Sequence, residues 1–161
     1  MLSQTAEYAL RAIVHLAAAP GGPQTTRQIA EATHLPTPYL SKVLHSLARA
    51  GLVQPQRGLG GGFTLLVPPE RLSLYDVVQA VDPLPRIRTC PLGIEEHGIN
   101  LCPLHRRLDD ALELVEETFR RSTVADLLAG PGGSRPLCRC GHPDGGCRGA
   151  AADCDAPRVP P

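Results

Sequence analysis

The cysteines of this 161-residue chain are confined to its second half, and no cysteine precedes Cys90. The six are Cys90, Cys102, Cys138, Cys140, Cys147 and Cys154. A secreted domain held together by disulfides would spread its cysteines through the fold. The segregation therefore predicts a local metal-binding or redox site.

Cys90 and Cys102 are twelve positions apart, and His105 follows Cys102 by three residues. Cys102 stands directly before Pro103, at the expected start of a long helix, where the helix dipole favours a thiolate. Thiolates together with a neutral imidazole suit Zn or Fe–S sites. The alternatives are buried thiols, a redox pair that forms a disulfide, and a surface histidine.

The last 32 residues, 130–161, contain the other four cysteines together with seven Gly and six Pro. So many helix- and strand-breaking residues predict a flexible tail without a packed element. The spacing of Cys138, Cys140 and His142, followed by Cys147 and Cys154, matches no zinc module. Metal binding by the tail, or donation of one ligand to another site, is the alternative to a set of exposed thiols.

The chain has 16 Lys+Arg and 16 Asp+Glu and thus no net charge, which argues against a protein that coats nucleic acid by charge alone. Residues 1–67 nevertheless carry five basic side chains and two acidic ones, a local balance of +3. Hydrophobic residues make up 42% of the chain, enough for a folded core. Neither a membrane helix nor a signal peptide is predicted, so we expect a cytoplasmic protein with no membrane partner.

Helices are predicted in the first third of the chain. Apolar residues at three- and four-residue spacing indicate a helix over 3–19. Thr25 and Gln28 have the spacing of a capping box, so a short helix is expected from there to about Thr33.

A second short helix is predicted after a tight turn. Thr37 is the expected N-cap with Pro38 at the first helical position, and the helix should end at Ala50, before Gly51. A β-hairpin should follow, with the sequence RGLGGG at residues 57–62 as its tip. The expected buried stripe of the helix is Leu40, Val43, Leu44 and Leu47.

Two short helices followed by a Gly-rich hairpin are typical of a winged helix-turn-helix, in which the second helix enters the DNA major groove. Arg57 is placed to enter a minor groove or to bind a phosphate. The alternative is a small α+β domain without a DNA role. The candidate DNA-binding residues are Thr37, Tyr39, Ser41, Lys42, His45, Arg57, Gly60 and Gly61.

The second half of the chain predicts two further helices around a loop. Ser73 and Asp76 should cap the first, and the loop from Asp82 to Leu101 carries Cys90. A long helix over 103–128 has an apolar stripe, which indicates either an intramolecular packing helix or an intersubunit helix pair. Because two-fold dimers read paired half-sites, we expect a homodimer on a palindromic operator in double-stranded DNA.

These segments resemble the IscR/NsrR/CymR family of bacterial winged-helix transcription regulators. The resemblance rests on SQTAEYALRAIVHLA, on PTPYLSKVLHSLARAGLVQPQRGLGGGFTL and on RLSLYDVVQAV. It covers about residues 1–128 and is strongest from Tyr39 to Leu65. It implies a mainly α fold with a small β-hairpin wing, a long C-terminal dimerisation helix, a homodimer and, in many members, an iron–sulfur cluster that tunes DNA affinity.

The cluster-binding members of that family have three cysteines spaced C-x5-C-x5-C. Cys90 and Cys102 match the outer pair, whereas Glu96, followed by His97, stands at the middle position. This departure counts against a three-cysteine cluster. Two thiolates, one imidazole and one carboxylate would still provide four ligands for a 2Fe–2S cluster, with a 4Fe–4S cluster as the alternative.

The resemblance also extends to the other two candidate ligands. His105 resembles the histidine ligand of the IscR type, and Glu7 stands where NsrR-like members use a carboxylate of the first helix from the other subunit. Glu7 could instead pair with Arg11 at i,i+4 spacing. The expected ligands are Cys90, Cys102, His105 and Glu7.

The sequence thus predicts a winged helix-turn-helix over 1–82, a cluster or sensor loop over 83–102, a dimerisation helix over 103–128 and a tail over 129–161. The expected function is a transcription regulator, most simply a repressor, whose DNA affinity responds to an iron–sulfur cluster that senses iron, redox state or nitric oxide. The alternatives are a thiol-based redox regulator without a cluster and a metal- or thiol-handling protein that uses the cysteine-rich tail. The sequence shows no pairing of a nucleophile with a base, so no enzymatic activity is expected.

Overall fold

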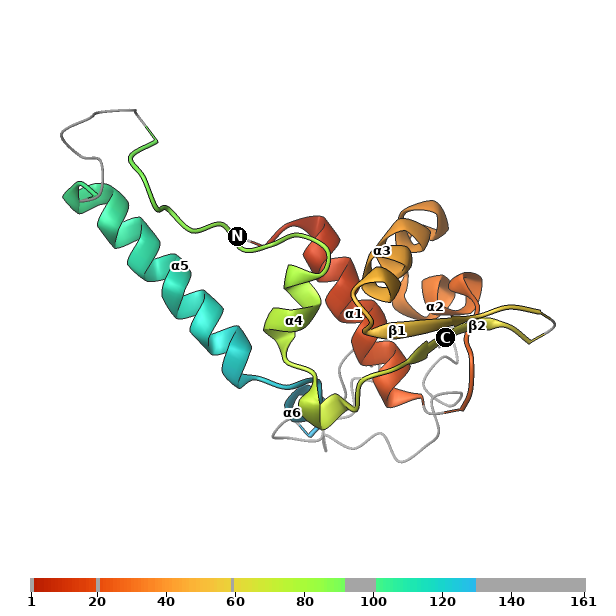
Figure 1. Cartoon of the computed structure of the whole chain (residues 1–161). Coiled ribbons are helices and arrows are strands. Elements are labelled where there is room, and N and C mark those ends of the chain that lie inside the picture. The colour runs from red at the N-terminus through yellow and green to blue at the C-terminus, as the bar shows by residue number, and fades with distance from the viewer. Residues whose placement is uncertain (1, 20, 59, 92–100, 130–161) are drawn as a thin grey trace, which may run out of the picture.

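The computed structural model describes residues 2–19, 21–58, 60–91 and 101–129 (Figure 1). This part of the chain is mainly helical with one two-stranded antiparallel hairpin, which confirms the predicted fold class. None of its helices is long and apolar enough to cross a membrane. The elements are α1 (Gln4–Ala18), α2 (Thr26–Thr33), α3 (Thr37–Arg49), β1 (Val53–Gln56), β2 (Gly62–Leu65), the 3-10 helix η1 (Pro69–Arg71), α4 (Leu74–Gln79), α5 (Pro103–Arg121) and α6 (Val124–Leu128).

The core is built around α1, which contacts α2, α3, α4, α6 and β2. Ala9 and Ala12 are fully buried on α1, and their small side chains let neighbouring helices approach closely. Ile13 of α1 and Leu44 of α3 are also fully buried, each contributing roughly 1.5–3 kcal/mol by leaving water. All four residues of the stripe predicted for α3 are buried, namely Leu40, Val43, Leu44 and Leu47.

The capping box predicted at the start of α2 is confirmed. The Thr25 hydroxyl oxygen accepts from the backbone N–H of Gln28 at 3.2 Å, and the Gln28 side-chain oxygen accepts from the backbone N–H of Thr25 at 2.8 Å. The turn to α3 begins at His34, whose φ of 55° lies in the left-handed region. Across this turn α2 packs against α3, and both helices contact α1.

The predicted cap of α3 is wrong by one residue. Thr37 is the first helical residue, and Pro36 is the N-cap without a side-chain hydrogen bond. The reason is local: Pro38 has no N–H to be capped, and the Tyr39 N–H donates to the Pro36 carbonyl oxygen at 3.1 Å. The first turn of α3 therefore has few backbone N–H groups that need a hydrogen bond to a threonine hydroxyl oxygen.

The hairpin after α3 pairs Val53 with Leu65 at its base and Gln56 with Gly62 near its tip. Gly62 is required by close approach, because a Cβ there would lie 2.3 Å from the Gln24 carbonyl oxygen. Gln24 and Phe63 exchange backbone hydrogen bonds of 3.0 and 2.8 Å, which attach the hairpin to the segment before α2. The wing is thereby fixed to the helices.

The single helix predicted over 103–128 is two helices in the structure. After α5, Thr123 caps α6 in a capping box with Asp126. The intervening residues are extended because the Leu74 N–H donates to the Ser122 carbonyl oxygen and the Val124 N–H donates to the Leu72 carbonyl oxygen, both at 2.9 Å. The break lets α6 fold back onto α1 and η1.

Helix α5 lies apart from α1, α2 and α3, and the segment that follows α4 runs beside it (Figure 1). None of the residues of α5 is buried. At its C-terminal end, the Arg120 guanidinium lies 3.7 Å from the centre of the Tyr75 ring of α4. Helix α5 therefore presents an apolar side that the described residues leave exposed.

Candidate functional site

The side chains predicted to contact DNA lie on the outer side of α3 and on the wing. Thr37, Lys42 and His45 are exposed, whereas Ser41 is half-buried. The apolar stripe of α3 points into the core, so this polar side is available to a groove. The His45 ring meets the buried Phe63 ring edge-on at 6.0 Å, which connects the outer side of α3 to β2.

Tyr39 has a second role that the sequence did not indicate. Its hydroxyl is hydrogen-bonded to the Thr5 hydroxyl at 2.8 Å, and its ring stands edge-on to Tyr8 at 5.5 Å. Its side chain is still 40% exposed. Tyr39 thus connects the start of α3 to the start of α1, while part of its ring remains available at the surface.

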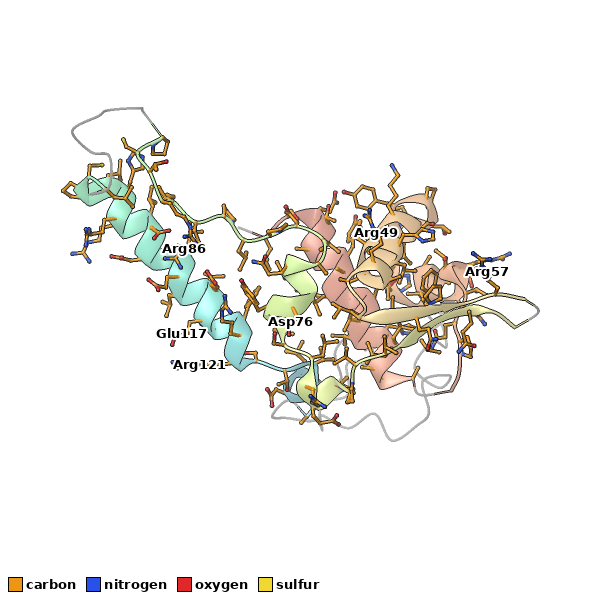
Figure 2. The ribbon with its side chains drawn as sticks, viewed as in Figure 1. Arg49, Arg57, Asp76, Arg86, Glu117 and Arg121 are labelled. Carbon is orange, nitrogen blue, oxygen red and sulfur yellow. The ribbon has the colours of Figure 1, made fainter. Side chains whose placement is uncertain are left out.

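The wing places Arg57 well away from the core. Figure 2 shows Arg57 on the hairpin, at the opposite end of the molecule from Arg86. Arg57 is exposed, and Gly60 and Gly61 follow it in the turn. Gly60 has a φ of 79°, a conformation that a side chain would disfavour.

Three of the four predicted ligands lie together at the start of α5. His105 Nδ1 is 3.2 Å from Cys102 Sγ and 4.0 Å from Cys90 Sγ. Cys102 is the N-cap of α5, with Pro103 at the first helical position, as the sequence predicts. Cys90 comes from the segment after α4 and is 8% exposed.

This donor set suits a metal site in kind, although it is incomplete. Two ligands of one tetrahedral ion lie about 3.5 Å apart, given metal–ligand bonds of about 2.0–2.3 Å. The distances from His105 Nδ1 to Cys102 Sγ and Cys90 Sγ, 3.2 and 4.0 Å, lie just below and just above this separation of about 3.5 Å. Within the described ranges, however, no group of three or more His, Cys, Asp or Glu side chains is arranged to hold a metal ion.

The fourth predicted ligand, Glu7, lies elsewhere in the fold. It is exposed on α1 and forms an ion pair with Arg11 one turn later. That pair is the alternative which the i,i+4 spacing predicted. Several other candidates lie outside the described residues, namely Glu96, His97, Cys138, Cys140, His142, Cys147 and Cys154.

Arg86, which precedes the thiol site in the loop, was not among the predicted site residues. Its Nε and Nη2 donate to the two carboxylate oxygens of Asp109, both at 2.8 Å, and its Nη1 donates to Glu116 at 3.3 Å. The hydrogen bonds from Arg86 have the largest effect on Asp109, and the hydrogen bond from the Ile87 N–H has the next largest. Together they lower the pKa of Asp109 to about 2. The missed signal was the spacing of Asp109, Glu113 and Glu116 along one side of the helix.

Comparison with known proteins identifies the fold and family. The family described as Rrf2, iron-dependent transcriptional regulator, matches residues 2–130. The transcriptional repressor NsrR of Streptomyces coelicolor is 32% identical over 152 residues, which cover 89% of this chain and 99% of the relative.

Two solved structures are similar over most of their length. CymR, the global cysteine regulator of B. subtilis, is 25% identical with a TM-score of 0.67, covering 80% of this chain and 96% of that one. IscR of T. potens is 25% identical with a TM-score of 0.66, covering 80% of this chain and 86% of that one. The winged helix-turn-helix fold agrees with the long family match and with these relatives. The chain belongs to the Rrf2 family of transcriptional regulators.

Proposed function

We propose that this transcriptional regulator is a homodimeric repressor whose affinity for a palindromic operator is set by a site at Cys90, Cys102 and His105. The observation that carries the proposal is the meeting of these three side chains at the N-terminus of α5. They come from two segments separated in sequence, so a group bound there would fix the loop against the helix. The name of the NsrR relative supports the role of repressor.

For the DNA contacts, we assign phosphate binding to Lys42 and groove contacts to Arg57. Thr37 and the exposed part of Tyr39 stand at the N-terminal end of α3, the end of a recognition helix that reaches base edges. Tyr39 also connects α3 to α1. A shift of α1 would therefore be transmitted to the start of the recognition helix.

Dimerisation is proposed through α5. Its large apolar side chains are unusually exposed, with Leu104 and Leu114 at 64%, Leu108 at 47% and Val115 at 40%. An apolar side of this length on a water-soluble domain indicates a protein interface. A second copy of the same helix provides a two-fold partner, which suits the symmetry of a palindromic operator.

The cofactor that fits the thiol site best is an iron–sulfur cluster, with 2Fe–2S preferred. Cys90, Cys102 and His105 would hold it, and Glu7 of the partner subunit is the proposed fourth ligand. When bound, such a cluster supplies a redox-active centre. The protein ligands would also have a structural role. Cys90 and Cys102 would hold the two sides of the loop, and Glu7 would connect the site to α1.

Anaerobic purification tests the cofactor. We expect a coloured protein that contains iron and acid-labile sulfide, and we expect Cys90→Ala and Cys102→Ala each to lose both. A chain that ends at Ala129, without the tail cysteines, is the matched control and should keep its iron. Full loading of the Cys90→Ala variant, or loss of iron on truncation alone, would place the site in the tail.

A thiol-based redox regulator is the second candidate, favoured by the 3.2 Å contact between Cys102 Sγ and His105 Nδ1. The imidazole can accept the thiol proton, leaving a thiolate that attacks an oxidant. With hydrogen peroxide, the two thiols would lose two electrons and two protons, forming a Cys90–Cys102 disulfide and two waters. Mass spectrometry of the peroxide-treated, iron-free protein should detect that disulfide, and only unlinked peptides would exclude this candidate.

A further inference from the structure

Arg86 binds three acidic side chains of α5 at once. The bidentate pair with Asp109 is joined by Glu116 at 3.3 Å and by Glu113 at 3.5 Å. The Ile87 N–H donates to the same Asp109 carboxylate at 2.8 Å. Four interactions thus fix one short stretch of the loop against one side of the helix (Figure 2).

These contacts are better protected than ordinary surface ion pairs. The side chains of Arg86, Asp109 and Glu116 are 27%, 19% and 14% exposed, respectively. A planar guanidinium that binds a carboxylate through two parallel hydrogen bonds also fixes orientation, which a lysine ammonium cannot do. The Arg86–Asp109 pair therefore fixes both the position and the orientation of this stretch of the loop on α5.

The same segment and the same side of α5 carry the thiol site. His105 precedes Asp109 by four residues, one helical turn, and so lies on the same side of α5. Cys90 follows Arg86 by four residues in the loop. None of the residues of α5 is buried, and the half-buried side chains of Arg86, Asp109 and Glu116 join this stretch of the loop to the helix.

We infer that Arg86, through Asp109, is a positioning residue that holds the loop along α5 so that Cys90 faces Cys102 and His105. The inference deepens the proposed function and relies on it only for the biological role of the two thiols. The positioning itself is a property of the folded chain. It can be measured whether or not a cluster is bound in the cell.

The test is the rate at which dibromobimane, a short reagent that reacts with two thiols, bridges Cys90 and Cys102. The protein is the full chain, reduced and freed of metal with a chelator. The tail thiols are removed by Cys138→Ser, Cys140→Ser, Cys147→Ser and Cys154→Ser. We expect Arg86→Gln and Asp109→Asn each to slow bridging by about tenfold, because the effective concentration of one thiol near the other falls.

Three controls separate positioning from loss of the fold. Arg121→Gln removes an arginine that pairs with Glu117 within α5, and should leave bridging unchanged. Arg86→Lys keeps the charge without the bidentate pair and should restore part of the rate. In a Cys90→Ser background, Cys102 should react with monobromobimane equally fast with and without the Arg86→Gln substitution, because one thiol needs no partner.

The outcomes are distinct from those of the cofactor experiment. Slow bridging in Arg86→Gln and Asp109→Asn, with unchanged Cys102 labelling and unchanged circular dichroism, supports the inference even if no iron is ever bound. Wild-type bridging rates in both folded variants would overturn it. If Arg86→Gln does not fold, the Arg86→Lys and Asp109→Asn rates decide, and wild-type rates in these two would likewise overturn it.

Discussion

Lys42 lies on the exposed side of α3 with its ammonium available to a DNA phosphate. A phosphate contact carries no sequence information, so Lys42→Ala should weaken binding to operator and random DNA alike. The slope of log affinity against log salt should fall by about 1. Gel shifts at several salt concentrations measure both effects.

Arg71 provides the matched control, because it is exposed on η1, which contacts α6. Arg71→Ala should leave affinity and salt slope unchanged. A Lys42→Ala protein that changes its preferred operator while keeping its affinity for random DNA would contradict the assigned role.

Asp109 gives the ion pairs of the loop a defined pH dependence. Its pKa is about 2 in the folded chain, below the ordinary value of 3.8, because Arg86 and the Ile87 N–H favour the carboxylate. As pH falls, the unfolded chain binds this proton first, so the stabilisation is complete above about pH 4 and is lost towards pH 2. Melting temperatures between pH 5 and 2, compared with Asp109→Asn, should show a smaller decline in the variant; parallel curves would refute this account.

At the scale of the elements, the attachment of the wing depends on Gly62. A Cβ at this position would lie 2.3 Å from the Gln24 carbonyl oxygen, so Gly62→Ala must separate β2 from the segment before α2. We expect a loss of about 1–3 kcal/mol in the free energy of unfolding, measured by urea denaturation. Gly21→Ala is the control, because a Cβ there meets nothing within 4 Å; equal stability of the two variants would be the contrary result.

Elements that depend on local residue spacing were predicted from the sequence, whereas the break between α5 and α6 was not. The buried stripe of α3 and the box of Thr25 with Gln28 depend on local spacing, and both were predicted. The break after α5 depends on backbone pairing of Ser122 and Val124 with residues about fifty positions earlier. Such pairing has no local signature, although the capping residue Thr123 could have been recognised.

The candidate site was predictable to a similar degree. The proximity of His105 to Cys102 follows from one helical turn, and the structure shows it. The approach of Cys90 depends on how a loop lies along a helix, which the family resemblance implied and the spacing alone did not. Arg86 was missed because its three partners lie on a different element.

At the scale of the whole molecule, the exposed side of α5 predicts the oligomeric state. Leu108→Lys places a charge among apolar side chains and should convert a dimer to a monomer in sedimentation experiments. Leu66→Lys changes an exposed leucine outside α5 and should leave the dimer intact. A monomeric wild-type protein, or a Leu108→Lys dimer, would count against the proposed interface.

If the Cys90, Cys102 and His105 site controls DNA binding, removal of its iron must change the affinity for DNA. The measurement is the affinity of the anaerobically purified full chain for DNA selected from a random-sequence pool, before and after iron is removed with a chelator. We expect the affinity to change by tenfold or more, about 1.4 kcal/mol or more, in the wild type and not to change in a Cys90→Ala, Cys102→Ala double variant. Equal affinity of the wild type with and without iron, or the same iron dependence in the double variant, would contradict it.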